Sequence, residues 1–155
     1  MVMARLLLRH PPLRAMAWFQ IATLALQKHV RGVPSWVQRR LPRLYGLELV
    51  PGSDIGGGFY VAHPVGCVLV AESVGRNVTV IGQVTFGTRT DNRWPRISDR
   101  VFVGAGPRIF GRIEIGEGAS VGSNAVVMES VSPGTTVVGI PARPVVKGAT
   151  RQRDR

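Results

Sequence analysis

His63 is the residue in this sequence best suited to acid–base chemistry, and it stands between an apolar strand-like segment and a Pro-Val-Gly turn. A histidine titrates near neutral pH, so its imidazole can take a proton from a hydroxyl group. Glu48 lies fifteen residues before it. A carboxylate held against one ring nitrogen fixes the tautomer and supports positive charge on the ring. A lone histidine is more often structural, so a general-base role requires a fold that brings these two residues together.

A second polar group lies in residues 88–96. It contains Arg89, Asp91, Asn92, Arg93 and Trp94. Side chains of these types are rarely selected for packing, so this segment is a candidate for substrate contacts. No metal site is expected, because the chain has one cysteine and its three histidines are too far apart for ligand spacing.

A six-residue repeat is the element that must position these side chains. Aliphatic residues recur at Ile97, Val103, Ile109, Ile115, Val121 and Val127, and a poorer copy of the pattern runs through Ile55, Val61, Cys67, Val74, Val80 and Phe86. This period fits neither an α-helix nor a single half-buried strand. A fixed repeat predicts stacked coils, here a parallel β-solenoid with a column of Ile and Val. A coil of about eighteen residues would place Glu48 next to His63, and the extra residues before Ile97 predict a protruding loop.

A helical segment is expected before the repeats. The apolar residues 15–26 predict a helix over about 13–30, which Gly32 and Pro34 end, and a second short helix runs from Ser35 to Leu41 because Pro42 limits it. We divide the chain into an N-terminal helical segment (1–45), a β-helix domain (46–147) and a basic tail (148–155). The fold class is therefore mainly β with a short α-helical segment.

The net charge of +11 favours anionic partners. No nucleic-acid-binding motif is present, so we predict no nucleic-acid partner. Residues 15–26 would span about 18 Å as a helix, well short of a bilayer core. Residues 13–45 are therefore expected either to contact a membrane surface or to cap the open end of the solenoid. A secretory signal is the weaker interpretation because Pro11-Pro12 interrupts its start, and the single Cys67 forms no internal disulfide, so we predict a cytoplasmic protein.

Residues 46–147 resemble hexapeptide-repeat acyltransferases of the serine O-acetyltransferase type, in a compact form. The resemblance rests on the repeats, on Gly-Gly-Gly-Phe-Tyr-Val-Ala-His-Pro-Val-Gly at 56–66, on residues 97–111, and on Gly-Ile-Pro-Ala-Arg-Pro-Val at 139–145. It implies a left-handed parallel β-helix, assembled as a homotrimer or a dimer of trimers, with acetyl-CoA as co-substrate bound between neighbouring solenoids.

The resemblance also implies roles for single residues. His63 matches the general base of the family, and Glu48 stands where the family has an Asp that pairs with this histidine. Arg93 matches a loop arginine that holds the acceptor's carboxylate. Two positions depart from the family pattern, because Trp94 replaces a second histidine and Ala62 replaces an aspartate that help to bind the amino acid. The residues of acyl transfer are therefore better kept than those of serine recognition.

For the co-substrate, the resemblance points to small residues that let the pantetheine arm approach the backbone and to cations that meet the CoA phosphates. The small residues are Gly87, Gly104, Ala105, Gly122 and Ser123, and the cations are Arg143 and Lys147. Turns also require small residues for their own geometry. We predict a CoA-dependent O-acetyltransferase acting on a serine-like amino acid or a sugar. The alternatives are a non-catalytic solenoid scaffold and an acyltransferase acting on a lipid-linked saccharide at the membrane surface.

Overall fold

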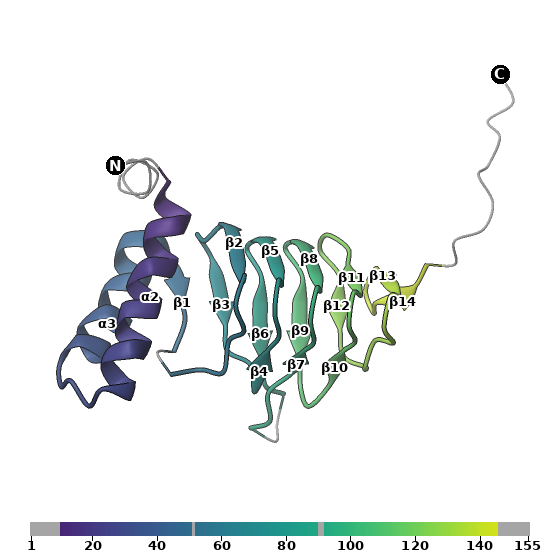
Figure 1. The fold of residues 1–155 in the computed structure, drawn as a ribbon. Coiled ribbons are helices and arrows are strands. Elements are labelled where there is room, and N and C mark those ends of the chain that lie inside the picture. The colour runs from purple at the N-terminus through teal and green to yellow at the C-terminus, as the bar shows by residue number, and fades with distance from the viewer. Residues whose placement is uncertain (1–9, 51, 90–91, 146–155) are drawn as a thin grey trace, which may run out of the picture.

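The protein is a column of parallel β-coils with two helices across one end (Figure 1). This computed structural model describes residues 10–50, 52–89 and 92–145. The predicted basic tail lies outside these ranges. The mainly β, left-handed parallel β-helix that was expected is confirmed.

The two helices lie side by side next to the first coil (Figure 1). Helix α2 (Pro11–Gln27) begins at two prolines, which suit the first helical turn because that turn needs no N–H donor. Helix α3 (Val33–Tyr45) runs past Pro42, so the prediction that this proline ends the helix is wrong. Only the last turn lies beyond Pro42, and Gly46 in the left-handed conformation closes the helix with an N–H···O bond to the Pro42 carbonyl.

Fourteen short strands form the three faces of the described solenoid. The five-stranded sheet contains β1 (Leu47–Glu48), β3 (Cys67–Leu69), β6 (Thr85–Gly87), β9 (Arg108–Phe110) and β12 (Val126–Val127). The three-stranded sheet contains β4 (Ser73–Val74), β7 (Arg96–Ile97) and β10 (Glu114–Ile115). The six-stranded sheet contains β2 (Tyr60–His63), β5 (Thr79–Gly82), β8 (Phe102–Ala105), β11 (Ser120–Val121), β13 (Thr136–Val138) and β14 (Arg143–Pro144). All pairs are parallel except β13–β14.

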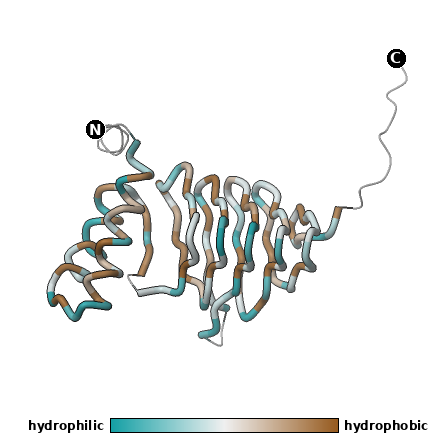
Figure 2. Tube along the Cα trace, viewed as in Figure 1, coloured by the Kyte–Doolittle hydropathy of each residue, from teal (hydrophilic) through white to brown (hydrophobic). Residues whose placement is uncertain are grey.

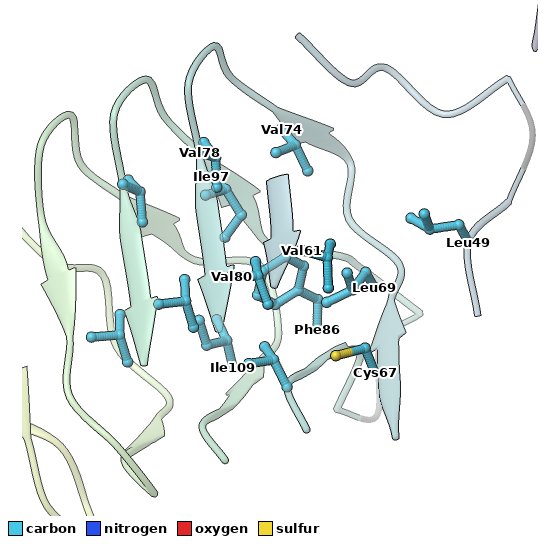
Figure 3. Packing of buried hydrophobic residues seen from close by; sticks show 14 of the residues in the cluster. Leu49, Val61, Cys67, Leu69, Val74, Val78, Val80, Phe86, Ile97 and Ile109 are labelled. Carbon is cyan, nitrogen blue, oxygen red and sulfur yellow. The ribbon is translucent and has the colours of Figure 1, made fainter. Parts of the chain in front are cut away.

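The core is the column of repeat residues that the sequence predicts. All six positions from Ile97 to Val127 are buried, and Phe86 is the largest fully buried side chain. Figure 3 shows how side chains from successive coils, among them Val80, Phe86 and Ile109, converge inside the solenoid. In Figure 2 apolar and polar segments alternate along every coil. Each buried Val or Ile contributes about 1.5–3 kcal/mol, so the stacked column is the main source of stability.

The coils differ in length where the sequence pattern is irregular. Val103 pairs with Val121, eighteen residues later, which is the regular coil. Val80 pairs with Val103, twenty-three residues later, because the connection between β6 and β7, residues 88–95, is five residues longer than the three-residue connections at the same corner of other coils. The loop expected between Phe86 and Ile97 is therefore present.

Candidate active site

His63 is the last residue of β2 and is exposed where the chain turns from the six-stranded to the five-stranded sheet. We call this turn, with its counterparts in the later coils, the His63 corner. Gly66 makes the turn possible with a φ of 76°. The Cys67 N–H donates to the Pro64 carbonyl over 3.1 Å. These contacts fix the backbone on which the imidazole is presented.

Cys67 begins the next strand and is fully buried. Its thiol donates a weak hydrogen bond to the His63 carbonyl over 3.5 Å. Burial raises the pKa of this thiol, so the sulfur stays protonated and is a poor nucleophile. The repeat pattern predicted Cys67 as a core position, and its burial confirms this, so the imidazole is the group available for chemistry at this corner.

Glu48 lies beside the same corner, one coil earlier. It pairs with Val68 in the five-stranded sheet, and the Gly66 N–H donates to the Gly46 carbonyl over 2.8 Å. The two chain segments are thus twenty residues apart in register, rather than eighteen, and Glu48 stacks beside the turn instead of on His63. Both side chains are exposed, and no hydrogen bond or ion pair joins them in the described part of the chain. Their pairing remains a prediction.

Gly82 is a site residue that sequence reasoning missed. It pairs with His63 across the ladder, and a Cβ atom on Gly82 would lie 2.8 Å from the His63 carbonyl oxygen and 3.0 Å from the His63 Cβ. Real Cβ atoms do not approach a backbone oxygen this closely, so any side chain here would displace His63. The signal available in the sequence was a glycine about one coil after the histidine.

Four of the predicted co-substrate positions continue the same corner. Gly82 pairs with Ala105, and the Asn124 N–H donates to the Ala105 carbonyl in the next coil over 2.9 Å. Gly104 lies against Ser123, since a Cβ on it would be 3.0 Å from the Ser123 N and Oγ atoms. Gly122 lies against Val138 of the last coil. A strip of small residues therefore runs from His63 along the axis of the solenoid.

Arg143 closes this strip at the far end. It pairs with Val138, and its guanidinium Nη1 lies 3.4 Å from a Glu129 carboxylate oxygen. Both side chains are exposed, so the ion pair leaves the cation accessible to other anions. Five ladder steps of about 4.8 Å separate the levels of β2 and β14, or roughly 24 Å in total. Lys147, the second predicted cation, lies outside the described residues.

The remaining candidates lie at a different corner. Gly87 ends β6 at the opposite end of the five-stranded sheet, where a Cβ atom would meet the Phe110 ring at 2.9 Å. Arg93 and Trp94 belong to the inserted loop that follows, with Arg93 exposed and Trp94 half-buried. Within one chain, the width of the five-stranded sheet separates this loop from His63. The predicted acceptor-binding residues and the predicted base are not brought together in a single copy.

Comparisons with other proteins agree on one kind of enzyme. No protein-family model matches the chain. A probable serine acetyltransferase of rice is 39% identical over 145 residues, which cover 84% of this chain and 46% of the rice protein. A serine acetyltransferase of Helicobacter pylori is 30% identical over 145 residues, which cover 91% of this chain and 85% of the bacterial one. The chain therefore spans less than half the length of the plant relative but most of the bacterial one.

Solved structures agree with this result. The serine acetyltransferase of Neisseria gonorrhoeae in complex with serine superimposes with a TM-score of 0.81 at 30% identity, covering 91% of this chain and 59% of the other. A serine acetyltransferase in complex with CoA superimposes with a TM-score of 0.75 at 28% identity, covering 84% of this chain and 55% of the other. The similarity includes both the helices and the solenoid, since it covers nine tenths of the chain in the first case.

Proposed function

Since this chain belongs to the serine acetyltransferase family, we propose that it transfers an acetyl group from acetyl-CoA to the hydroxyl of serine or of a small serine-like acceptor. The observation that carries this proposal is the His63 corner. There an exposed imidazole stands at one end of a strip of small residues, and a cation, Arg143, stands at the other. Such a transfer needs a general base and a surface along which an extended thioester can lie, and the imidazole and the strip would supply these two parts.

In the proposed reaction His63 takes the proton from the acceptor hydroxyl as its oxygen attacks the thioester carbonyl. The new C–O bond forms, and the carbonyl electrons move onto oxygen in a tetrahedral intermediate. When the intermediate collapses, the C–S bond breaks and the CoA sulfur takes the proton from the imidazolium. Glu48, beside the same corner, would favour the positive ring electrostatically. No acyl-enzyme is formed, so Cys67 and the hydroxyl side chains need no covalent role.

The co-substrate would lie along the strip at the His63 corner. Ala105 and Ser123 are small and exposed, so they would leave the backbone beside them open to the amide-rich pantetheine arm, while Gly104 and Gly122 let the coils stack closely. Arg143 would meet the phosphates through charge-assisted hydrogen bonds, helped by Lys147. The roughly 24 Å between the levels of β2, which ends in His63, and β14, which begins with Arg143, suits an extended arm with its thioester at one end and its charge at the other. Gly87 lies at the other corner, just before the inserted loop, so any contact of Gly87 with the co-substrate would be made beside that loop.

A homotrimer would complete the site. His63 and the loop of Arg93 and Trp94 lie at opposite ends of the five-stranded sheet. A complete site would therefore combine the His63 corner of one copy with the loop of a neighbouring copy. The surfaces support this division. The three-stranded sheet carries the ion pair Glu72–Arg96, which suits a face in water. The six-stranded sheet exposes apolar side chains at Tyr60, Phe102 and Val138, and Met128 is exposed just beyond β12 of the five-stranded sheet, which suits faces between copies. A cytoplasmic location completes the proposal.

The acceptor is the open part of the proposal. Arg93 favours an acceptor with a carboxylate, because guanidinium and carboxylate form paired hydrogen bonds. Trp94 stands where the family has a histidine, and its half-buried ring offers an apolar face on which a sugar can stack. A sugar hydroxyl is therefore the second candidate acceptor. A lipid-linked saccharide would be such an acceptor only if the N-terminal helices hold the enzyme at a membrane surface.

An acceptor panel tests this function. Purified protein is mixed with acetyl-CoA and, in turn, L-serine, homoserine, other hydroxylated amino acids and sugars, and free thiol is measured as CoA is released. We expect release with one class of acceptor and loss of that release in His63→Ala. Release that persists in His63→Ala, or a complete failure to bind acetyl-CoA, would contradict the proposal and favour a non-catalytic solenoid.

A further inference from the structure

Helix α2 is apolar on two opposite faces. One face packs inward through Ala15, Phe19 and Ala22, all of which are buried. The opposite face exposes Ile21 to 48% and Leu24 to 54%. A helix that is apolar all round is normally covered on all sides, because its apolar surface is costly to leave in water. No described residue covers the outer face of α2, so a partner is expected to cover it.

The groove between α2 and α3 is also apolar but has a cationic edge. The rings of Trp18 and Trp36 meet edge to face, with centroids 5.4 Å apart. The guanidinium of Arg40 lies 5.3 Å from the centre of the Trp36 ring, and Leu44 is 58% exposed beside them. Indole rings and long basic side chains combine an apolar body with a polar tip. This combination suits a boundary between water and hydrocarbon.

The charge of this end of the molecule is uniform. Residues 1–47 contain eight of the twenty Lys and Arg residues and none of the nine Asp and Glu residues. Among the described residues the cations are Arg14, Lys28, Arg31, Arg39, Arg40 and Arg43. The other 108 residues carry twelve basic and nine acidic side chains, so eight of the eleven net positive charges lie in less than a third of the chain. Whatever covers α2 must therefore tolerate or prefer this positive charge.

We propose that the cap formed by α2 and α3 docks on the surface of a bilayer that contains anionic phospholipid. Ile21 and Leu24 would enter the boundary of the acyl chains, Trp18 and Trp36 would lie at headgroup depth, and the surrounding Arg and Lys side chains would meet the phosphates. A second copy of the cap is a poorer occupant, because it would bring two acid-free basic surfaces together. In the described part of the chain no helix is long and apolar enough to cross a membrane, so the cap would lie on the surface.

Docking in this way would hold the first coils close to the bilayer. The cap lies across the end of the solenoid, and α2 contacts β2, the strand that ends in His63 (Figure 1). The His63 corner therefore begins at the membrane side of the molecule, while Arg143 lies at the far end. This inference does not rest on the acetyltransferase proposal, because vesicle binding is measured without any acceptor or acetyl-CoA.

Vesicle co-sedimentation of the full chain tests the docking. We expect the protein to pellet with vesicles of phosphatidylcholine that contain about one third phosphatidylserine, to release as salt rises, and to stay in solution with phosphatidylcholine alone. The double substitution Ile21→Glu and Leu24→Glu should abolish pelleting. Arg39→Gln with Arg43→Gln should weaken the partition about thirtyfold, since each cation near an anionic surface adds about 1 kcal/mol.

A matched pair on the solenoid controls for net charge. Arg76→Gln with Arg112→Gln removes the same two charges from exposed positions away from the cap, and pelleting should stay within about threefold of wild type. Circular dichroism and size in solution confirm that each variant folds and assembles. The proposal is overturned if the wild type ignores anionic vesicles, or if the solenoid pair weakens binding as much as the cap pair. It is equally overturned if the α2 substitutions change only the oligomeric state.

Discussion

The His63 corner and the loop that contains Arg93 lie at opposite ends of the five-stranded sheet and differ in how the chain builds them. The corner is part of the ladder itself, and the two coils that follow His63 place the small residues Gly82 and Ala105 in register with it. The loop is an insertion that lengthens one coil to twenty-three residues. A repeated scaffold holds a base and an extended co-substrate with precision, whereas an insertion can change without disturbing the core. Acyl transfer is thus expected to depend on the corner, and the choice of acceptor on the loop.

The largest expected effect is the recovery of activity in oligomers that mix His63→Ala and Arg93→Ala chains, because it tests whether the corner and the loop of one site come from different copies. His63→Ala and Arg93→Ala should each be impaired alone, about a thousandfold in kcat for the first and about tenfold or more in kcat/KM for the second. When the two are unfolded together and reassembled, a neighbouring pair with one intact corner and one intact loop should return about a quarter of the wild-type activity. Mixing the separately folded variants without reassembly is the control, and no recovery after reassembly would place both groups in one copy.

Gly82→Ala should produce the next largest effect. The new Cβ would press on the His63 backbone, and a displacement of about 1 Å at a catalytic group costs on the order of ten- to a hundredfold in kcat. Gly57→Ala is the matched control, because a Cβ there meets nothing within 4 Å and the backbone is not left-handed. Steady-state kinetics and thermal melts separate the two outcomes. An equal loss in both variants would mean that the corner does not position His63.

Arg93→Ala should affect acceptor binding more than turnover. If the guanidinium holds a carboxylate, KM for a carboxylate-bearing acceptor should rise about tenfold or more while kcat and KM for acetyl-CoA change little. Acceptors without a carboxylate should be indifferent to the substitution. A fall in kcat with unchanged KM would instead assign Arg93 to the transfer step and erase the distinction between corner and loop.

Glu48→Gln should have a smaller effect, about three- to tenfold in kcat, because this carboxylate is exposed and makes no contact with His63 in a single chain. Glu117→Gln, at a different corner of the solenoid, is the control and should leave kcat unchanged. Steady-state kinetics check both variants, and an unchanged kcat in Glu48→Gln would remove this residue from the site.

The weakest effect is expected on the three-stranded sheet. The hydrogen bond from Arg96 lowers the pKa of the Glu72 carboxyl below its ordinary value of 4.5. The stabilisation from this pair is present above that ordinary value and is lost as the pH falls through the lowered pKa. Glu72→Gln should therefore lower Tm slightly near pH 7 and not at all in strong acid. Melting curves across this range check it, and a difference that grows on acidification would contradict the assignment.

The parts of the molecule that follow one period were predictable from the sequence. A six-residue spacing of Val and Ile determines which side chains enter the column, so the buried core from Ile97 to Val127 and the position of the loop could be derived. The register of the irregular coils was not predictable from the sequence. No local sequence feature indicates the twenty-residue offset that places Glu48 beside Val68. The length of α3 was missed because a proline near the last turn costs less than one in the middle. Gly82 required the register before its role was visible.

The most direct test compares acetyl-CoA binding and acetyl transfer in the wild type and in His63→Ala. We expect both proteins to bind acetyl-CoA with similar Kd, because the strip and Arg143 are intact in each, and only the wild type to release CoA with its acceptor, by a margin of about a thousandfold. Equal turnover in the two proteins would show that His63 is not the base. Failure of the wild type to bind acetyl-CoA would contradict acyl transfer at this corner altogether.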